Sequence, residues 1–159
     1  MYTKHLWTDR IKWLLRKKKD KECVFCRIVK GFDNKLVLKK GEIFVVLNKF
    51  PYNTGHLLVF PKRHVENFED LDEKELIDIS ITVKKCIVFL RKALKPEGFN
   101  IGVNLGEVAS ASIPHLHYHI VPRFKNDAGF MEVISSTKVM PESLKNTYKR
   151  LKKFSHLLE

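Results

Sequence analysis

The chain contains the segment Ile113-Pro114-His115-Leu116-His117-Tyr118-His119-Ile120-Val121-Pro122-Arg123, in which histidine and apolar residues alternate strictly. Side chains in a β-strand point alternately to the two faces of a sheet. The alternation therefore predicts a strand over residues 115–122 with its three histidines on one face. Seven histidines occur in the whole chain, so three on one face indicate a chemical role. The structural alternative is three imidazoles that are simply hydrogen-bonded in place.

The spacing of the three histidines divides their roles. Neighbouring positions on one face of a strand are roughly 7 Å apart, and the outer two are roughly 13 Å apart. One phosphate group can therefore contact two adjacent imidazoles but hardly all three. Imidazole is neutral and nucleophilic near pH 7, which suits attack on phosphorus. We expect two neighbouring histidines to serve a phosphate and the third to do something else.

The sequence on both sides of this strand predicts an α+β fold with a mainly antiparallel, five-stranded sheet. A hairpin with Gly41 in its turn joins residues 36–38 to 43–47, and a turn over 51–55 leads into a buried strand over 56–60. Apolar residues three or four apart predict a helix from Asp72 to Leu94, with Asp72 and Glu75 as its capping box. A strand over 99–104 and a loop to residue 112 follow, and a last helix opens at Pro141.

The length of 159 residues fits a single domain, and 44% hydrophobic residues exclude a mostly disordered chain. We expect a basic N-terminal helix and connector over 1–22, a core over 23–123, and a C-terminal tail and helix over 124–159. The two terminal helices would be additions to the two main helices of the core. No apolar run is long enough to cross a bilayer, and no signal peptide is visible, so a cytoplasmic protein without membrane partners is expected.

The formal net charge of +12 is concentrated at the two ends of the chain. Such a charge attracts polyanions, including nucleic acid and polyphosphate-bearing small molecules. Solvated faces of surface helices are the alternative explanation. Nucleic acid as a partner is possible but not favoured, because no separate binding module follows the histidine strand.

Beyond the alternating strand, several segments carry a resemblance to a known family. They are Asn48 followed by Gly55-His56-Leu57-Leu58-Val59, then Pro61-Lys62-Arg63-His64, and Phe99-Asn100-Ile101-Gly102-Val103-Asn104-Leu105-Gly106 with the loop up to Ser112. With these segments the chain resembles the histidine triad (HIT) superfamily over nearly its whole length. Its start and end are most similar to the diadenosine tetraphosphate phosphorylase-like branch.

This resemblance implies a HIT-like fold and a role for each site residue. His117 would be the nucleophile that attacks the α-phosphorus, and His119 would donate a hydrogen bond to a phosphate oxygen. Ser112 and backbone amides near Ser110 would hold the same phosphate. The remaining nucleotide contacts would come from Asn48 and His56 near the ribose and base, from Asn104 near the phosphates, and from an apolar base pocket around Ile43 and Phe44.

Two of these positions have ordinary structural alternatives, and the phosphate loop departs from the family pattern. His56 could be a plain histidine at a strand end, and Asn48 a turn residue. Ser110 stands where the superfamily usually has glycine, and Ala111 where many members carry glutamine. These departures leave the preference for a leaving group open but do not affect the nucleophile.

The pair Cys23 and Cys26 has the spacing of a zinc half-site. His64 and His115, the triad histidine not needed for phosphate, fit the other half, as in superfamily members that bind structural zinc through two cysteines and two histidines. A redox pair and two free thiols are the alternatives. Cys86, within the long helix, is expected to serve packing alone.

The resemblance implies an enzyme that cleaves a dinucleoside polyphosphate, with adenine favoured, through a nucleotidyl-histidine intermediate and with phosphate or water as acceptor. The alternatives are hydrolysis of a nucleoside phosphoramidate such as an adenylated amine, removal of adenylate from DNA ends, and a non-catalytic nucleotide- or nucleic-acid-binding protein with a zinc knuckle. A homodimer is expected, and no organic cofactor.

Overall fold

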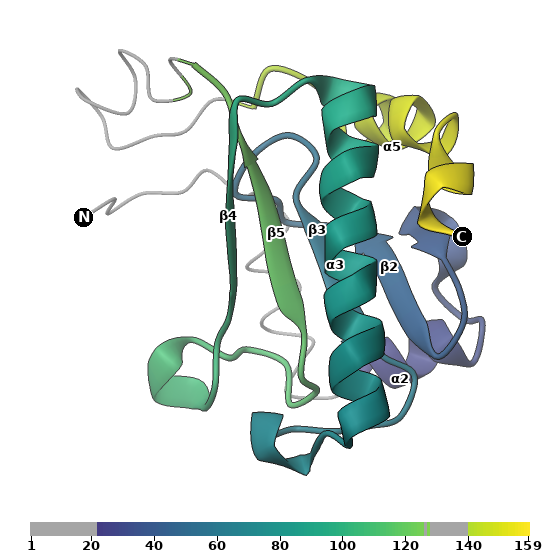
Figure 1. Ribbon diagram of the computed structural model, residues 1–159, viewed down its shortest axis with the longest axis vertical. Coiled ribbons are helices and arrows are strands. Elements are labelled where there is room, and N and C mark those ends of the chain that lie inside the picture. Colours follow the sequence, from purple (N-terminus) through teal and green to yellow (C-terminus); the bar gives the residue numbers. More distant parts are fainter. Residues whose placement is uncertain (1–21, 126, 128–139) are drawn as a thin grey trace.

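The computed structural model describes residues 22–125, 127 and 140–159. Five strands of this part of the chain form one antiparallel sheet in the order β1-β2-β3-β5-β4 (Figure 1). The strands are β1 (Val37–Lys39), β2 (Ile43–Leu47), β3 (Leu57–Pro61), β4 (Gly98–Val103) and β5 (Tyr118–Arg123). The sheet confirms the predicted fold class and the predicted hairpin between β1 and β2.

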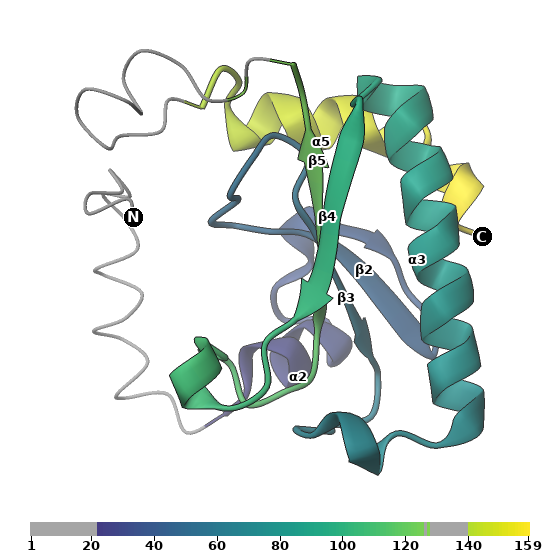
Figure 2. The ribbon, with the colours of Figure 1, turned by 60° about the vertical axis from the view of Figure 1, so that its left-hand side comes forward.

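Helices cover both faces of the sheet. The long helix α3 (Glu73–Leu94) lies along one face, and the short helix α2 (Val24–Val29) lies on the opposite side (Figure 2). Helix α5 (Leu144–Lys152) and the 3₁₀ turn η4 (Ser155–Leu158) lie beside α3. Shorter 3₁₀ turns are η1 (Asn34–Leu36), η2 (Phe68–Asp70) and η3 (Glu107–Ala109).

The apolar side chains form one cluster on each face, because successive residues of β2 and β3 point to opposite sides. The cluster on the α3 side includes Val45, Leu57, Phe89, Leu116 and Ile120. The cluster on the α2 side includes Phe25, Phe44, Val46, Leu58 and Phe60. The chemistry described below lies on the α2 side.

Helix α3 begins where the sequence predicts. The Asp72 carboxylate accepts from the Glu75 backbone N–H at 2.7 Å, and the Glu75 carboxylate accepts from the Asp72 N–H at 3.2 Å. These two bonds satisfy backbone donors that a helix start leaves unpaired. Cys86 on this helix is fully buried in the apolar cluster on the α3 side, as expected for a residue that serves packing.

Two predicted boundaries were wrong. The strand expected from His115 begins only at Tyr118, because Pro61 has no N–H for the ladder and its carbonyl accepts from the His115 side chain instead, at 2.9 Å. The helix expected to open at Pro141 begins at Leu144, because the Ser143 hydroxyl caps it by accepting from Asn146 N–H at 3.3 Å. This helix ends at Lys152 rather than running on to residue 158.

Helix α2 was not predicted, since six residues are too few to show helical periodicity. The helix expected over residues 6–18 lies outside the described residues, and only Glu22 of the connector after it is described. None of the helices that the structure describes is long and apolar enough to cross a membrane.

Candidate active site and metal centre

The three histidines of the triad lie on the α2 side of the sheet, as their alternation predicts. The ring of Phe25 in α2 lies 5.5 Å from the His115 ring and 5.1 Å from the His117 ring, centroid to centroid. The rings of His117 and His119 are 4.9 Å apart. The intervening residues Leu116, Tyr118 and Ile120 pack toward α3. His117 and His119 are therefore the neighbouring pair that one phosphate could reach.

Hydrogen bonding fixes the tautomer of His117. Its Nδ1 lies 2.8 Å from the backbone carbonyl of His115, which can only accept. Nδ1 therefore carries the proton, and Nε2 keeps its lone pair. Burial lowers the pKa of His117, although the bond to the carbonyl opposes this shift in part. The ring is thus held neutral with its nucleophilic nitrogen defined, as attack on phosphorus requires.

A chain of hydrogen bonds fixes His119 in the opposite tautomer. The Tyr52 backbone N–H donates to His56 Nδ1 at 3.0 Å, so the proton of neutral His56 is on Nε2. His56 Nε2 lies 2.9 Å from His119 Nδ1 and donates to it. His119 then carries its own proton on Nε2, where it can be donated to a phosphate oxygen. Burial, followed by the nearby His117, lowers the pKa of His119 to about 4.

The side chains of Asn48 and His56 are in hydrogen-bond contact with each other. Asn48 Oδ1 accepts from the Phe50 N–H at 2.9 Å, which turns Asn48 Nδ2 toward His56 Nδ1 at 3.2 Å. His56 is 0% exposed. Its polar atoms contact protein groups on both sides of the ring, so its side chain supports His119 from behind.

The loop after β4 brings Asn104, Ser110 and Ser112 to the end of β5 that carries the histidines. Asn104 Nδ2 donates to the Ser110 carbonyl at 3.5 Å, and Ser112 is half-buried. Ser110 adopts a left-handed conformation with φ of 68°, which glycine tolerates best. Gly102 pairs with His119 across the sheet, and a Cβ at Gly102 would meet no atom within 4 Å. The histidine face is therefore open at this point.

Four potential metal ligands converge beside the triad. These are the sulfurs of Cys23 and Cys26 and the ring nitrogens of His64 and His115, and the ligand atoms all lie within 4.8 Å of one another. His115 Nδ1 is 3.5 Å from Cys23 Sγ, and His64 Nδ1 is 3.2 Å from Cys26 Sγ. Burial, followed by the nearby Cys23, raises the pKa of Cys26 to about 11. A bound cation would offset this cost of forming the thiolate.

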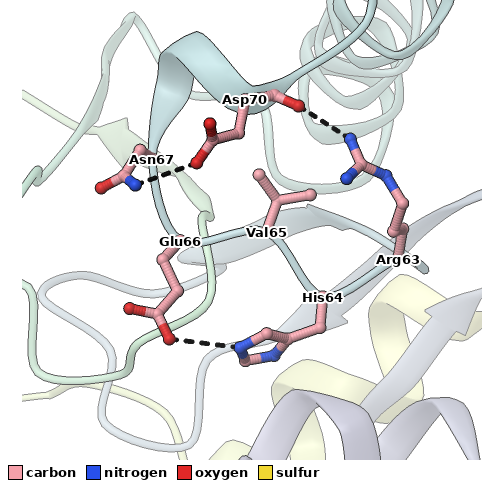
Figure 3. Close-up of a pocket in the computed structure, with 6 residues that line it drawn as sticks. All are labelled: Arg63, His64, Val65, Glu66, Asn67 and Asp70. Atoms are coloured by element: carbon pink, nitrogen blue, oxygen red, sulfur yellow. Dashed lines mark hydrogen bonds and ion pairs between the residues drawn. The ribbon is translucent and has the colours of Figure 1, made fainter.

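Each histidine of this cluster is oriented by a partner on its other nitrogen. His115 Nε2 donates to the Pro61 carbonyl, and His64 Nε2 lies 3.4 Å from the Glu66 carboxylate, as Figure 3 shows. Both Nδ1 atoms are thereby left as acceptors. Such outer partners are typical of histidines that bind metals. The donor set of two sulfurs and two nitrogens fits a closed tetrahedral zinc site.

Sequence reasoning missed three contributors to this site. Phe25, between the two cysteines, touches two triad rings. The Tyr52 ring is 46% exposed and stacks on His119 with centroids 5.9 Å apart. Glu66 follows His64 by two residues, a spacing that could have suggested a partner. Of the two residues expected near a base pocket, Phe44 lies in the cluster on the histidine side and Ile43 in the cluster on the α3 side, so only Phe44 is on the face where the pocket is predicted.

Comparison with known proteins agrees with this geometry. Residues 30–126 match the HIT domain. The AP-4-A phosphorylase of Mycobacterium tuberculosis strain H37Rv is 42% identical over 118 residues, which is 73% of this chain and 60% of that protein. The chain thus spans less than two thirds of that relative. The adenosine 5'-monophosphoramidase hnt1 of Schizosaccharomyces pombe is 33% identical over 77% of this chain and 90% of its own length.

A solved structure is similar over most of the chain. A Zn-bound histidine triad family protein from Mycobacterium smegmatis aligns with a TM-score of 0.72 and 26% identity, covering 86% of this chain and 95% of that one. The match over residues 30–126, the triad on one sheet face and this likeness lead to one conclusion. The chain belongs to the HIT-domain family.

Proposed function

We propose that this chain is an enzyme that acts at the α-phosphate of an adenine dinucleoside polyphosphate, with His117 as nucleophile and His119 as hydrogen-bond donor. The observation that carries the proposal is the pair of opposite tautomers on adjacent rings. His117 offers a lone pair on Nε2, and His119 offers a proton on Nε2. A nucleophile beside a donor for the phosphate oxygen is the arrangement that nucleotidyl transfer needs.

The reaction proceeds in two displacements. The Nε2 lone pair of His117 forms a bond to the α-phosphorus, and the bond from phosphorus to the bridging oxygen breaks, so that the leaving nucleotide takes the electron pair. The His115 carbonyl stabilises the positive charge that develops on the His117 ring. An oxygen of water or inorganic phosphate then attacks the same phosphorus, and the phosphorus–nitrogen bond returns its electrons to Nε2. When water is the acceptor, its proton passes to solvent.

The loop residues Asn104, Ser110 and Ser112 are proposed to bind the phosphates. Asn48 and His56 are proposed to act through His119 rather than through direct contact with a base. The net charge of +12 supports the choice of a polyanionic substrate, since it attracts such molecules to the protein.

Phosphoramidate cleavage is the second candidate function. It is favoured by the likeness to the adenosine 5'-monophosphoramidase, 90% of whose length the chain covers. His117 would keep its role, and the leaving group would be an amine. The side chain of Ala111 has no polar group that could distinguish a nucleotide from an amine as leaving group. The two kinds of substrate must therefore be compared by experiment.

The test is product analysis of three proteins: wild type, His117→Ala and the matched control His156→Ala, whose histidine is exposed in η4 far along the chain from the triad. Diadenosine tetraphosphate is supplied with and without inorganic phosphate, and adenosine phosphoramidate in a parallel reaction. If ADP and ATP form only when phosphate is present, the enzyme is a phosphorylase. If AMP and ATP form without phosphate, it is a hydrolase. If AMP forms only from the phosphoramidate, the second candidate function is supported. No turnover of either substrate would refute the enzymatic proposal.

We also propose that Zn²⁺ binds at Cys23, Cys26, His64 and His115 as a structural ion. Its binding would hold the segment around α2 against the triad, and the Phe25 contacts would carry this order to the His117 ring. A reducing cytoplasm would keep the two thiols available. Metal analysis of the purified chain, with zinc absent after Cys26→Ala but present after Cys86→Ala, tests the assignment.

We propose that two copies of this chain form a homodimer through the exposed edge of the sheet. β4 is an edge strand, and its Ile101 side chain is 45% exposed. An exposed edge with apolar side chains favours pairing with another chain. Sedimentation of wild type and of Ile101→Lys tests this: a wild-type dimer that the charge dissociates supports it, and a wild-type monomer overturns it.

A further inference from the structure

Four polar side chains form a cluster at the end of the sheet away from the metal ligands. We call it the Asp127 cluster, and it consists of Asn53, Asn100, Arg123 and Asp127. Arg123 binds the Asp127 carboxylate through two nitrogens, at 2.6 and 2.8 Å, and its third nitrogen donates to Asn100 in β4 at 2.8 Å. Asn53 Nδ2 donates to the same carboxylate at 2.8 Å. The cluster thus joins three separate parts of the chain, which are the turn over 51–55, β4, and the end of β5 with the residues after it.

Asn53 is the member that reaches into the protein. It is 4% exposed, and its Nδ2 also donates to the Pro122 carbonyl at 3.0 Å. Its Oδ1 accepts from the Thr54 N–H at 3.0 Å, and its backbone carbonyl accepts from the His56 N–H at 3.1 Å. Every polar group of the side chain is used, and together these bonds fix the turn over residues 51–55 against the end of β5.

Close packing against helix α3 restricts where the turn over residues 51–55 can lie. Gly55 has a φ of 81°, and a Cβ there would collide with Leu94 Cδ1 at the end of α3. The turn lies directly on the helix on one side and is bonded to Pro122 and Asp127 on the other. Its position is therefore held by packing on α3, by the Pro122 carbonyl and by the bond from Asn53 to Asp127, of which the last belongs to the Asp127 cluster.

This turn presents the group that begins the hydrogen-bond chain to His119. The Tyr52 N–H donates to His56 Nδ1, and the Tyr52 ring stacks on His119. If the turn moves, His56 Nδ1 keeps only the longer contact with Asn48 Nδ2, at 3.2 Å, so the proton on Nε2 is held less firmly and the tautomer of His119 is less strictly set. A displacement of about 1 Å in a group that positions a reactant can cost on the order of 100-fold in rate.

We propose that Asn53 and Asp127 are positioning residues for catalysis, which set the tautomer of His119 through the turn that carries Tyr52. The inference rests on the proposed function for its kinetic consequence, but the tautomer itself is a property of the protein without substrate. Neither residue touches the reacting phosphate, so both act through His56 and His119.

The test compares Asn53→Ala, Asp127→Ala and the double variant with wild type. We expect each single change to lower kcat about tenfold while KM changes by less than about twofold, because substrate contacts are retained. Because both residues act through one turn, the kcat of the double variant should be little lower than that of the less active single variant. Fold-losses that multiply would show that the two residues act independently and would overturn the proposal.

A second readout uses the full chain without substrate. Nitrogen-15 NMR of the imidazoles distinguishes protonated from unprotonated ring nitrogens, and His119→Gln assigns the signals. Wild type should show His119 protonated on Nε2 alone, and both alanine variants should show a mixture. Lost activity with an unchanged tautomer would refute the proposal, as would a variant with unchanged kcat.

The control is Asn67→Ala, which removes another hydrogen bond between an asparagine and an aspartate, the exposed bond from Asn67 Nδ2 to Asp70 at 2.9 Å, outside the turn over 51–55 and the Asp127 cluster. It should leave kcat and the tautomer unchanged. If the alanine variants do not fold, Asp127→Asn and Arg123→Lys, which weaken the same ion pair, carry the same comparison. A wild type that cleaves no nucleotide refutes the proposed function, whereas the NMR comparison still decides the role of the cluster.

Discussion

The buried His56 predicts a specific loss of stability in mild acid. Burial, followed by the nearby His119 and His117, lowers the pKa of His56 from 6.5 to about 3. In the folded protein the ring stays neutral as the pH falls below 6.5, whereas in the unfolded chain it binds a proton. The unfolded state therefore binds more protons over the interval from about 6.5 to 3, and the free energy of unfolding must fall as the pH falls through it.

The size of this loss follows from the two pKa values. Each pH unit below 6.5 costs about 1.4 kcal/mol until the folded pKa is reached. At pH 5, about 1.5 units below, His56 alone should have lowered the free energy of unfolding by about 2 kcal/mol. His119, whose pKa is also lowered by burial, to about 4, should add a similar amount.

Urea unfolding followed by circular dichroism at pH 7, 6 and 5 measures the effect. His56→Gln keeps an N–H near the position of Nε2 but cannot titrate, so its loss of stability between pH 7 and 5 should be smaller than that of wild type by about 2 kcal/mol. His156→Gln, at an exposed position, should behave as wild type. Protonation of the metal ligands affects all three proteins alike and cancels. Equal losses in wild type and His56→Gln would refute the reasoning.

Three further changes have definite expected results. Ser110→Gly removes the cost of a left-handed serine and should raise the free energy of unfolding by about 0.5 kcal/mol, measured by urea unfolding; a loss of stability would contradict this. Gly55→Ala should lower it by at least about 2 kcal/mol, because its Cβ collides with Leu94 and φ is positive; near-normal stability would show that the turn can shift. A zinc chelator should lower the melting temperature of wild type but not of Cys26→Ala, and equal shifts in both would argue against the metal site.

Local patterns predicted most of the secondary structure. The alternation through the triad identified the face of each side chain, and Asp72 with Glu75 identified the start of α3, because both signals depend only on neighbours in sequence. The predicted start of β5 was wrong because the true start depends on Pro61, which lies far away in the chain. The true strand start is determined by pairing with β3, a property that no local pattern records.

The candidate site was predicted in its residue types but not in its connections. No local pattern indicates that the ring of His56 lies behind His119, since burial depends on the packing of the whole sheet. The order of protons along Tyr52, His56 and His119 likewise requires three-dimensional contacts. The cysteine spacing worked better, because two ligands of the metal cluster are close in sequence and the geometry of that half is local.

His115 serves two sites with different parts of the same residue. Its ring belongs to the metal cluster, whereas its backbone carbonyl holds the proton of His117. Every amino acid presents a backbone carbonyl, so this second role does not depend on the residue type. The ion site can therefore be lost in evolution while the nucleophile keeps its orientation, provided that the local backbone path is retained. If the cluster binds zinc and His117 is the nucleophile, as proposed, the His115 carbonyl would still hold the His117 proton without the ion, although the ordering through Phe25 would be lost.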